Sequence, residues 1–395
     1  MYKGKYHLFY QHLPEGCEWA FGLVWGHAVS TDLVQWHHLP HALEPTPGSL
    51  DADGCFSGCA TVDTDGRPVI LYTGVRLRTN PALPLPPADR DLNLPFVESQ
   101  ISAIPADPDD HDLITWCKDS APFLELPPPD LELTGWRDPF VVERPSAANG
   151  NEWIVLIGSG LKGVGGACLV YRTTDLRRAA AWRYDGLLCC GDGETGAVWE
   201  CPLVAELQPM PPGARAPPAL ALGLGGRLRG GASGLGHAGA GLGAGGDGAG
   251  KAAGGGHERR PLRHDGPQPH HHHHAGEQQQ QQQQHYHHQL DPVNELQQLK
   301  LEAAAAPRRR RHFYTISPDA CTNPTIYWLG DYAGGRFDMA GAAGPFRLDL
   351  GDVLYAPNVM EDDHGRTLLW SWLQEKRTVQ GLTDEGEVES EGGGR

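Results

Sequence analysis

Two short phrases place a carboxylate beside unusual neighbours, between stretches that have β-strand patterns. One is Arg137-Asp138-Pro139 and the other is Trp199-Glu200-Cys201-Pro202. Two carboxylates at strand ends, with few cysteines or histidines in support, are typical of sites that cleave glycosidic bonds. In such sites one carboxyl group protonates the leaving oxygen, while a second carboxylate acts on the sugar. The two phrases therefore predict chemistry of this kind.

Asp138 precedes a proline, and proline suits the first position of a strand because it has no amide hydrogen. We expect a strand to begin at Pro139 and to hold the Asp138 carboxylate at its N-terminal end. Arg137 can then pair with that carboxylate or hold a substrate hydroxyl with its forked donors. Alternatively, Arg137 and Asp138 form a structural ion pair at a turn.

Glu200 lies between an aromatic residue and a thiol. Neighbours of low polarity raise the pKa of a carboxyl group, because burial disfavours its charged form. A carboxylic acid that stays protonated near neutral pH can donate its proton to a leaving oxygen. Alternatively, Glu200 is a partly buried residue before a strand that Pro202 ends.

A third set of residues has the chemistry that sugars need. A furanose ring has apolar surfaces and hydroxyl edges, so its sites combine aromatic rings with amides and hydroxyls. Residues of these types are Gln11, Trp19, Phe56 and Ser57. Each of them is equally compatible with a place in the core or in a turn.

Composition and missing motifs exclude several other classes of function. The net charge of −17 argues against a nucleic-acid partner, which requires clustered basic residues. No G-x-S-x-G elbow and no Walker phosphate loop occur. No apolar stretch is long enough to span a membrane. We therefore expect a small-molecule sugar as the partner, and neither nucleic acid nor membrane.

Metal and cofactor chemistry also lacks a motif. The nine cysteines include no C-x-x-C pair, which argues against a zinc site. Four histidines crowd one strand-rich stretch without a familiar ligand spacing: His27, His37, His38 and His41. We therefore predict no metal and no cofactor.

Composition divides the 395 residues into two structured blocks around a biased insert. Residues 1–209 and 312–376 carry the β-type patterns. Residues 210–311 hold Gly/Ala-rich sequence, a histidine run and a glutamine run. Such sequence buries too little apolar surface to offset its ordering entropy, so we expect this insert to be disordered. We expect the acidic residues 377–395 to form a flexible tail.

Short β-type stretches dominate both structured blocks, and convincing amphipathic helices are absent. The expected strands cover residues 6–10, 68–73, 139–143, 153–158, 168–172, 325–329 and 367–372. Two phrases recur: Ser30-Thr31-Asp32-Leu33 as Thr173-Thr174-Asp175-Leu176, and Gly66-Arg67 as Gly365-Arg366 before a second apolar stretch. Repeated small sheets of this kind predict an all-β fold, a β-propeller.

Taken in order, the phrases of both blocks resemble glycoside hydrolase family 32, the invertases and fructan hydrolases. The resemblance does not extend to the insert. The resembling segments are residues 2–11, 25–30, 56–58, 136–139, 200–202, 354–357, 365–366 and 369–375.

The resemblance implies a five-bladed β-propeller with a central pocket and a β-fructofuranosidase activity on sucrose or fructans. It implies that Glu200 is the acid/base and that Asp138 stabilises the transition state. It implies a retaining mechanism, in which nucleophile and acid/base lie about 5–5.5 Å apart. The positions that match substrate contacts are Gln11, Trp19, Phe56, Ser57, Arg137 and Cys201.

Three features depart from the family pattern. The family nucleophile is an Asp in an Asn-Asp-Pro-Asn-Gly phrase, and Met1 falls where that phrase should just have ended. We therefore expect no matching nucleophile in this chain and at most weak turnover, unless Asp51 or Asp53 takes its place. We expect no counterpart of the family's C-terminal β-sandwich. Cys59 stands where a small serine is usual.

Three hypotheses follow from these observations. In the first, the chain is part of a β-fructofuranosidase-type enzyme whose nucleophile lies upstream of Met1. In the second, it is a propeller that binds fructosides without cleaving them. In the third, it is an incomplete product with an exposed sheet edge. Met1 leads directly into a strand pattern, so no signal peptide is expected. Compartment and oligomeric state are not predicted.

Overall fold

The computed structural model describes residues 1–16, 19–81, 83–207, 312–319, 325–349, 351 and 353–373. Within these residues the chain forms β-strands and two short 3₁₀ turns, and no α-helix. No helix among them is long and apolar enough to cross a membrane. The prediction of an all-β fold is confirmed. The expected insert and tail lie outside the described residues, and the division into four segments proposed from composition stays a prediction.

Three antiparallel sheets contain four strands each. The first comprises β4 (Gly54–Val62), β5 (Pro68–Leu77), β6 (Phe96–Pro105) and β7 (Trp116–Lys118). The second comprises β8 (Leu133–Glu143), β9 (Trp153–Leu161), β10 (Gly165–Thr173) and β11 (Arg183–Cys190). The third comprises β12 (Trp199–Glu206), β13 (His312–Pro318), β14 (Ile326–Gly330) and β17 (Ala343–Arg347).

Three smaller antiparallel sheets complete the described fold. One comprises β1 (Tyr6–His12), β2 (Val24–Ser30) and β3 (His37–Leu43). The other two are the hairpins β15–β16 (Tyr332–Ala333 and Arg336–Phe337) and β18–β19 (Leu354–Glu361 and Thr367–Leu373). The two 3₁₀ turns cover Ala147–Asn149 and Ala179–Ala181.

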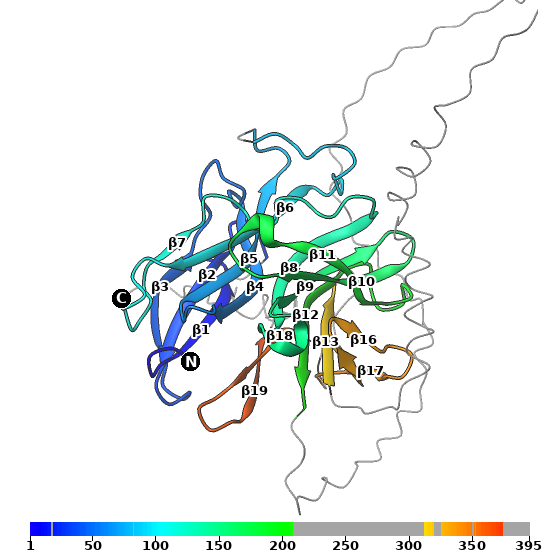
Figure 1. Ribbon diagram of the computed structural model, residues 1–395. Coiled ribbons are helices and arrows are strands. Elements are labelled where there is room, and N and C mark those ends of the chain that lie inside the picture. Colours follow the sequence, from blue (N-terminus) through cyan, green and yellow to red (C-terminus); the bar gives the residue numbers. More distant parts are fainter. Residues whose placement is uncertain are drawn as a thin grey trace, which may run out of the picture. The chain divides into compact units, whose positions relative to one another are not determined.

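The sheets pack face to face in chain order, as Figure 1 shows from blue through cyan to green. Strand β9 explains how, because alternate residues of a strand face opposite sides of its sheet. Val155 and Ile157 join an apolar cluster with Val69 of β5, on the side of the preceding sheet. Ile154 and Leu156 join another cluster with residues of β12 and β13. A strand buried on both faces therefore binds two neighbouring sheets.

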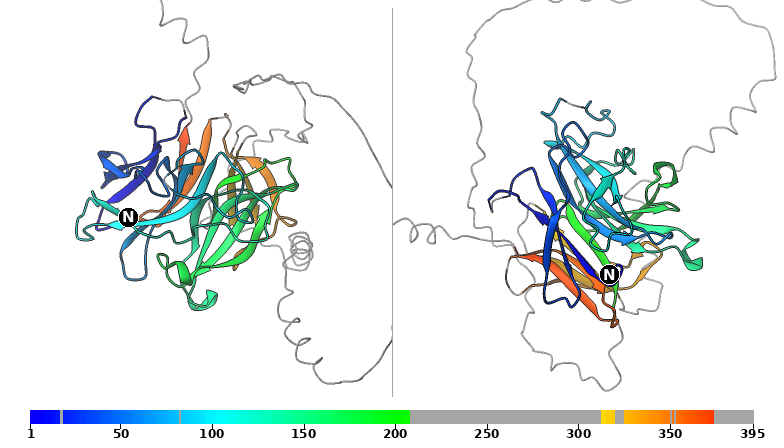
Figure 2. Two further views of the ribbon diagram at one scale, coloured as in Figure 1. Left: turned by 90° about the horizontal axis from the view of Figure 1, so that it is seen from above. Right: turned by 90° about the vertical axis from the view of Figure 1, so that its left-hand side faces the viewer.

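The first and last described sheets also meet. The Tyr6 hydroxyl on β1 donates a hydrogen bond to the Asp363 carboxylate in the β18–β19 turn. Trp36 and Trp370 meet edge to face, with ring centroids 5.6 Å apart. The right-hand view of Figure 2 shows the orange-red hairpin beside dark-blue β1. These contacts close a propeller-like arrangement of sheets.

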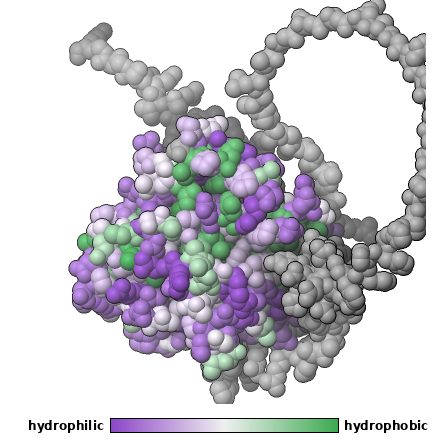
Figure 3. Space-filling view, turned by 45° about the horizontal axis from the view of Figure 1, so that its top comes forward, coloured by the Kyte–Doolittle hydropathy of each residue, from purple (hydrophilic) through white to green (hydrophobic). Residues whose placement is uncertain are grey.

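The prediction of five blades is wrong for the described residues. Four sheets, with three or four strands each, have the size of blades. The hairpin β18–β19 occupies the next place but pairs only two strands. Its apolar side chains are correspondingly less covered, and Leu369, Trp372 and Leu373 are exposed. On the face drawn in Figure 3, hydrophilic residues predominate and apolar ones form limited patches.

The recurring sequence phrases occupy matching places. One pair of turns follows β2 and β10. The other pair joins β4 to β5 and β18 to β19, where Asp63 and Asp362 begin the turns. Each of these carboxylates accepts hydrogen bonds from the backbone amides two and four residues further on, with N···O distances of 2.7–2.9 Å. The repetition seen in the sequence is therefore a repetition of turn chemistry.

A pair of histidines, His27 buried and His7 half-buried, lies in the first sheet. His7 Nδ1 and His27 Nε2 are 3.1 Å apart, and the His27 ring stacks on Phe9 with centroids 4.4 Å apart. Burial is the main cause that lowers the pKa of each histidine from 6.5 to about 4. Both imidazoles are therefore neutral in the folded chain at neutral pH.

Replacing Tyr6 tests the contact between the first and last sheets. Tyr6→Phe removes the hydrogen bond to Asp363, and we expect a loss of about 1 kcal/mol in the free energy of unfolding. Amide hydrogen exchange should speed up in β18–β19. Tyr10→Phe is the matched control, because its hydroxyl bonds His38 within the first sheet. Equal exchange in β18–β19 for both variants would contradict the closure.

Acid should destabilise the fold through the histidine pair. The unfolded chain binds protons near the ordinary pKa of 6.5, while the folded chain binds them only near 4. The neutral histidines thus contribute their full stabilisation above pH 6.5, and this contribution is lost as the pH falls toward 4. For buried His27 the loss in the free energy of unfolding is up to about 3 kcal/mol. We expect His27→Phe to flatten this dependence in urea unfolding measured at several pH values. The exposed variant His364→Gln should keep the wild-type slope, and an equally steep slope in both would refute the assignment.

Candidate active site

Four strands carry an irregularity at corresponding places. The register shifts between Cys55 and Gly58 in β4 and between Arg137 and Phe140 in β8. It shifts again after Glu200 in β12 and after Tyr355 in β18. Each of these strands is the first of its sheet, and consecutive ones pack against each other. A β-bulge re-aims the side chains of its strand, so the bulges bring re-aimed residues of neighbouring sheets together.

Three of the bulges share an unusual backbone. Asp138, Cys201 and Ala356 have φ values of 65°, 49° and 48°, and each precedes a proline. A residue other than glycine seldom adopts positive φ, while proline suits a bulge because no ladder bond needs its amide. The prediction that a strand begins at Pro139 is therefore wrong, since β8 begins at Leu133. Strand β12 likewise continues through Pro202 instead of ending there.

Arg137 is the centre of the site. Its buried guanidinium donates from Nη1 to Glu98 Oε1 at 2.8 Å and from Nε to Glu200 Oε1 at 2.8 Å. Its Nη2 donates to Asp319 Oδ2 at 3.1 Å. Glu98 also accepts the Trp136 amide at 2.8 Å. One cation thus joins carboxylates from three elements.

Glu200 has the electrostatics expected of an acid. Burial is the main cause that raises its pKa from 4.5 to about 7. Arg137 opposes this rise, while the negative charges of Asp138 and Asp319 add to it. The Glu200 side chain is still 20% exposed, so a bound molecule can reach it. The carboxyl group can therefore hold a proton near neutral pH and deliver it.

Cys201 on β12, the residue after Glu200, holds Asp138 beside Glu200. Asp138 Oδ2 accepts the Cys201 amide at 2.8 Å and lies 3.5 Å from the Cys201 thiol. The Asp138 amide donates to Thr73 Oγ1 at 2.9 Å. Burial raises the Asp138 pKa, against the opposing charge of Arg137. Two phrases far apart in sequence thus meet as the pattern predicted.

The sequence-predicted sugar contacts gather at β4, the strand that packs against β8. Burial raises the pKa of the Cys201 thiol, and the nearby Ser57 side chain opposes this rise. Trp19 is 56% exposed and meets the Phe56 ring edge to face at 6.2 Å. Gln11 Nε2 donates to the backbone carbonyl of Cys55, the residue before Phe56, at 2.9 Å. The structure therefore brings the set to the bulge of β4.

Sequence reasoning missed two carboxylates, Glu98 and Asp319. Glu98 lies within β6, in a buried strand where a charged residue requires a partner. This signal was present in the sequence but did not reveal the partner. Asp319 follows β13, where its Oδ1 accepts the Val198 amide at 3.1 Å. Its place beside Arg137 depends on packing between strands distant in sequence.

Asp51 and Asp53 serve the β4–β7 sheet. Asp51 pairs with Lys118 and accepts the Tyr72 hydroxyl at 2.8 Å. Asp53 Oδ2 accepts the Leu77 amide at 2.8 Å and the Asn80 side-chain amide at 3.1 Å. Both carboxylates are thus held by structural partners.

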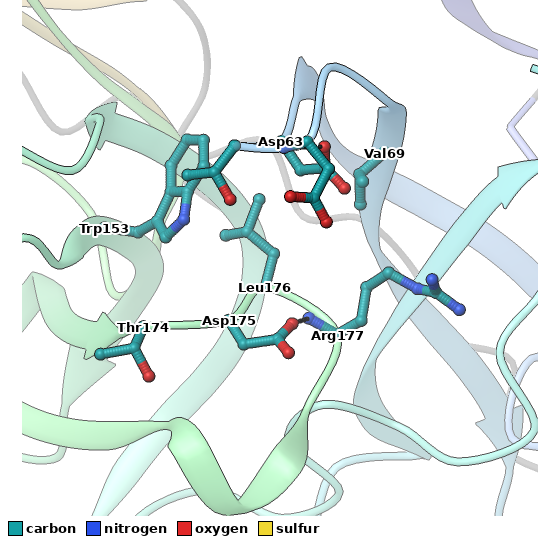
Figure 4. Close-up of a pocket in the computed structure, with 9 residues that line it drawn as sticks. Asp63, Val69, Trp153, Thr174, Asp175, Leu176 and Arg177 are labelled. Atoms are coloured by element: carbon teal, nitrogen blue, oxygen red, sulfur yellow. Dashed lines mark hydrogen bonds between the residues drawn. The ribbon is translucent and has the colours of Figure 1, made fainter.

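A separate cavity of about 120 Å³ lies between the β4–β5 turn and the segment after β10 (Figure 4). Its lining includes Asp63, Trp153 and Arg177, and no predicted site residue. The Asp63 carboxylate caps its own turn, and Arg177 pairs with Asp119. Over the described parts of the chain, no cluster of three or more His, Cys, Asp or Glu side chains could hold a metal ion.

The fold and site define a β-propeller protein with carboxyl groups gathered around a buried arginine. The pattern of the glycosyl hydrolases family 32 N-terminal domain matches residues 1–225 and 270–386. The chain therefore belongs to glycosyl hydrolase family 32.

Curated relatives agree with this assignment. The chain is 39% identical to beta-fructofuranosidase 1 of Zea mays over 201 residues, which are 51% of this chain and 27% of that protein. It is 38% identical to an acid beta-fructofuranosidase of Vicia faba over 200 residues, with the same coverage. The matched part thus spans about a quarter of each relative's length.

Solved structures show the same fold. Fructan 1-exohydrolase IIa from Cichorium intybus, in complex with 1-kestose, superposes with a TM-score of 0.57 at 21% identity. That match covers 98% of this chain and 52% of the other. The GH32 beta-fructofuranosidase BmSUC1 of Bombyx mori gives 0.54 at 22% identity, covering 96% and 55%. The chain spans about half of each structure.

Replacing Asp319 tests the electrostatics of the site. Asp319→Asn removes a negative charge that raises the Glu200 pKa, so we expect that pKa to fall by on the order of one unit. A ¹³C-carboxyl NMR titration measures it, with the Glu200 signal assigned by its loss in Glu200→Gln. The exposed variant Asp89→Asn is the charge-matched control. An unchanged Glu200 titration in Asp319→Asn would contradict the described network.

Proposed function

We propose that this chain supplies the propeller domain of a retaining glycoside hydrolase of the β-fructofuranosidase type, acting on sucrose or fructans. The observation that carries the proposal is the arginine-bridged carboxyl cluster. In it, Glu200 has a pKa of about 7 next to Asp138 on the neighbouring strand. The names of the relatives from Zea mays and Vicia faba support the same substrate class.

In the proposed reaction Glu200 is the acid/base. It protonates the glycosidic oxygen as the bond to the fructosyl carbon breaks, and general acid catalysis contributes roughly 10²- to 10⁴-fold. After the leaving group departs, the sugar is bound to the carboxylate nucleophile. The Glu200 carboxylate then takes a proton from a water molecule that attacks the fructosyl carbon and breaks its bond to that nucleophile. Arg137 holds Glu200 in place through Nε in both protonation states.

Asp138 is the proposed transition-state stabiliser. Positive charge develops on the sugar ring as the glycosidic bond breaks, and a fixed carboxylate beside it lowers the barrier. The Cys201 amide fixes Asp138 Oδ2, which leaves the other oxygen for sugar hydroxyls. Arg137 and Cys201 complete the polar wall around the ring.

The other residues of the proposed subsite match the two kinds of surface on the sugar, its apolar faces and its hydroxyl edges. Exposed Trp19 and neighbouring Phe56 present aromatic surface to carbon–hydrogen faces. Ser57 presents a hydroxyl group. Gln11 is tethered through Nε2 to a backbone carbonyl, so its Oε1 accepts from a sugar hydroxyl.

The covalent step needs a carboxylate nucleophile that this chain does not match. The proposal of turnover therefore concerns a polypeptide in which an Asn-Asp-Pro-Asn-Gly phrase supplies that carboxylate. A second candidate function is fructoside binding without cleavage. It is favoured by the structural partners of Asp51 and Asp53, which leave neither carboxylate available as a substitute nucleophile.

The experiment adds the Asn-Asp-Pro-Asn-Gly phrase to the N-terminus and measures glucose release from sucrose. We expect the extended protein to hydrolyse sucrose and Glu200→Gln to lower kcat at least about 10²-fold, because the acid is lost. Glu206→Gln, at the exposed end of β12, should keep the rate of the extended protein. Full turnover by extended Glu200→Gln would refute its role.

The unextended chain separates binding from catalysis. A ligand that binds only the folded state raises stability by mass action. Stabilisation by fructose without sucrose hydrolysis supports the binding function, and an unchanged Tm at saturating fructose contradicts it.

A further inference from the structure

Glu98 is the most deeply buried carboxylate of the cluster, and the proposed reaction gives it no task. It lies on β6, the third strand of the β4–β7 sheet, and its side chain is 1% exposed. Its Oε1 accepts from Arg137 Nη1 and its Oε2 accepts from the Trp136 amide, both at 2.8 Å. Glu98 therefore binds both the side chain of Arg137 and the backbone of Trp136.

We propose that Glu98 is a positioning residue, which locks the Arg137 guanidinium so that Nε faces Glu200 and shares its positive charge between the two carboxylates. The inference rests on the proposed role of Glu200 as acid/base. Glu98 itself touches neither the substrate nor the reacting atoms.

The geometry supports a lock. A guanidinium has donors fixed in one plane, so two anchors on different edges determine where the third donor points. Glu98 takes Nη1 and Asp319 takes Nη2, which leaves Nε directed at Glu200. Both anchors tie their second oxygen to a backbone amide, but Glu98 is the more rigid one because its side chain is only 1% exposed. Asp319 is 27% exposed.

The charges support a shared cation. The titratable groups around Arg137 are Glu98 from β6, Asp138 from β8, Glu200 and Cys201 from β12, and Asp319 after β13. A carboxylate that already engages the guanidinium weakens the positive potential that reaches the others. With Glu98 in place, Glu200 meets a partly neutralised cation and keeps its proton to higher pH.

Glu98→Gln tests this directly. Glutamine keeps the shape of the Glu98 side chain but removes its charge. Its amide nitrogen, which is a donor, must then face one of the two donors that Glu98 binds, Arg137 Nη1 or the Trp136 amide. We expect the Glu200 titration midpoint, measured by ¹³C-carboxyl NMR, to fall by about one pH unit. Glu98→Asp keeps the charge and draws it back by one methylene, so we expect a smaller fall. Glu132→Gln is the charge-matched control, because Glu132 is 79% exposed and pairs only loosely with Lys162 at 3.7 Å.

The outcomes distinguish positioning from mere support. A folded Glu98→Gln protein whose Glu200 midpoint equals that of Glu132→Gln would overturn the proposal. If Glu98→Gln does not fold, an unchanged midpoint in Glu98→Asp overturns it. Failure of both variants to fold would make Glu98 a structural residue and would also overturn it.

The readout does not need turnover. If the extended protein hydrolyses no fructoside but the midpoint still falls in Glu98→Gln, the proposed function fails and the positioning role stands. If the extended protein is active and the midpoint does not move, the positioning role alone fails. In an active protein, the alkaline limb of the kcat–pH profile should move with the midpoint, while KM stays within about twofold.

Discussion

The buried guanidinium of Arg137 is the interaction on which the site depends. Glu98, Glu200 and Asp319 come from separate elements, and all three hydrogen bond to this one group. Without a cation between them, buried carboxylates would repel each other and would each lose their hydration. The ion network therefore links three neighbouring sheets, which the apolar clusters also pack face to face.

The same network has a chemical consequence. One positive charge cannot neutralise four carboxyl groups when Asp138 is included, so retaining a proton becomes favourable. Glu200 is the member with solvent access and a pKa of about 7. Asp138 receives the Cys201 amide and thiol, which favour its charged form. The surroundings thus act differently on two neighbouring carboxyl groups: the Cys201 hydrogen bonds oppose the rise of the Asp138 pKa that burial causes, while the Glu200 pKa reaches about 7.

Local chemistry made part of this structure predictable from the sequence. Turn residues and strand patterns located most of the expected strands, and the phrases around Asp138 and Glu200 identified carboxyl groups that do meet. The rule that proline begins or ends a strand failed at Pro139 and Pro202, because a bulge tolerates proline inside a strand. A period-two pattern does not reveal a bulge.

Long-range contacts were not predictable. Glu98 lies in a strand that was not among the expected ones, and its partner lies on β8. Asp319 reaches Arg137 across 182 residues. The blade count came from the family resemblance, and the described residues give four blades and a hairpin. Packing between sheets decides these features, and no local pattern encodes it.

The titration midpoint of Glu200 in the unmodified chain tests the central claim most directly. If Arg137 is shared among buried carboxyl groups as described, a ¹³C-carboxyl NMR titration will place that midpoint at about 7. A midpoint near the ordinary glutamate value of 4.5 would contradict the network and the acid role built on it.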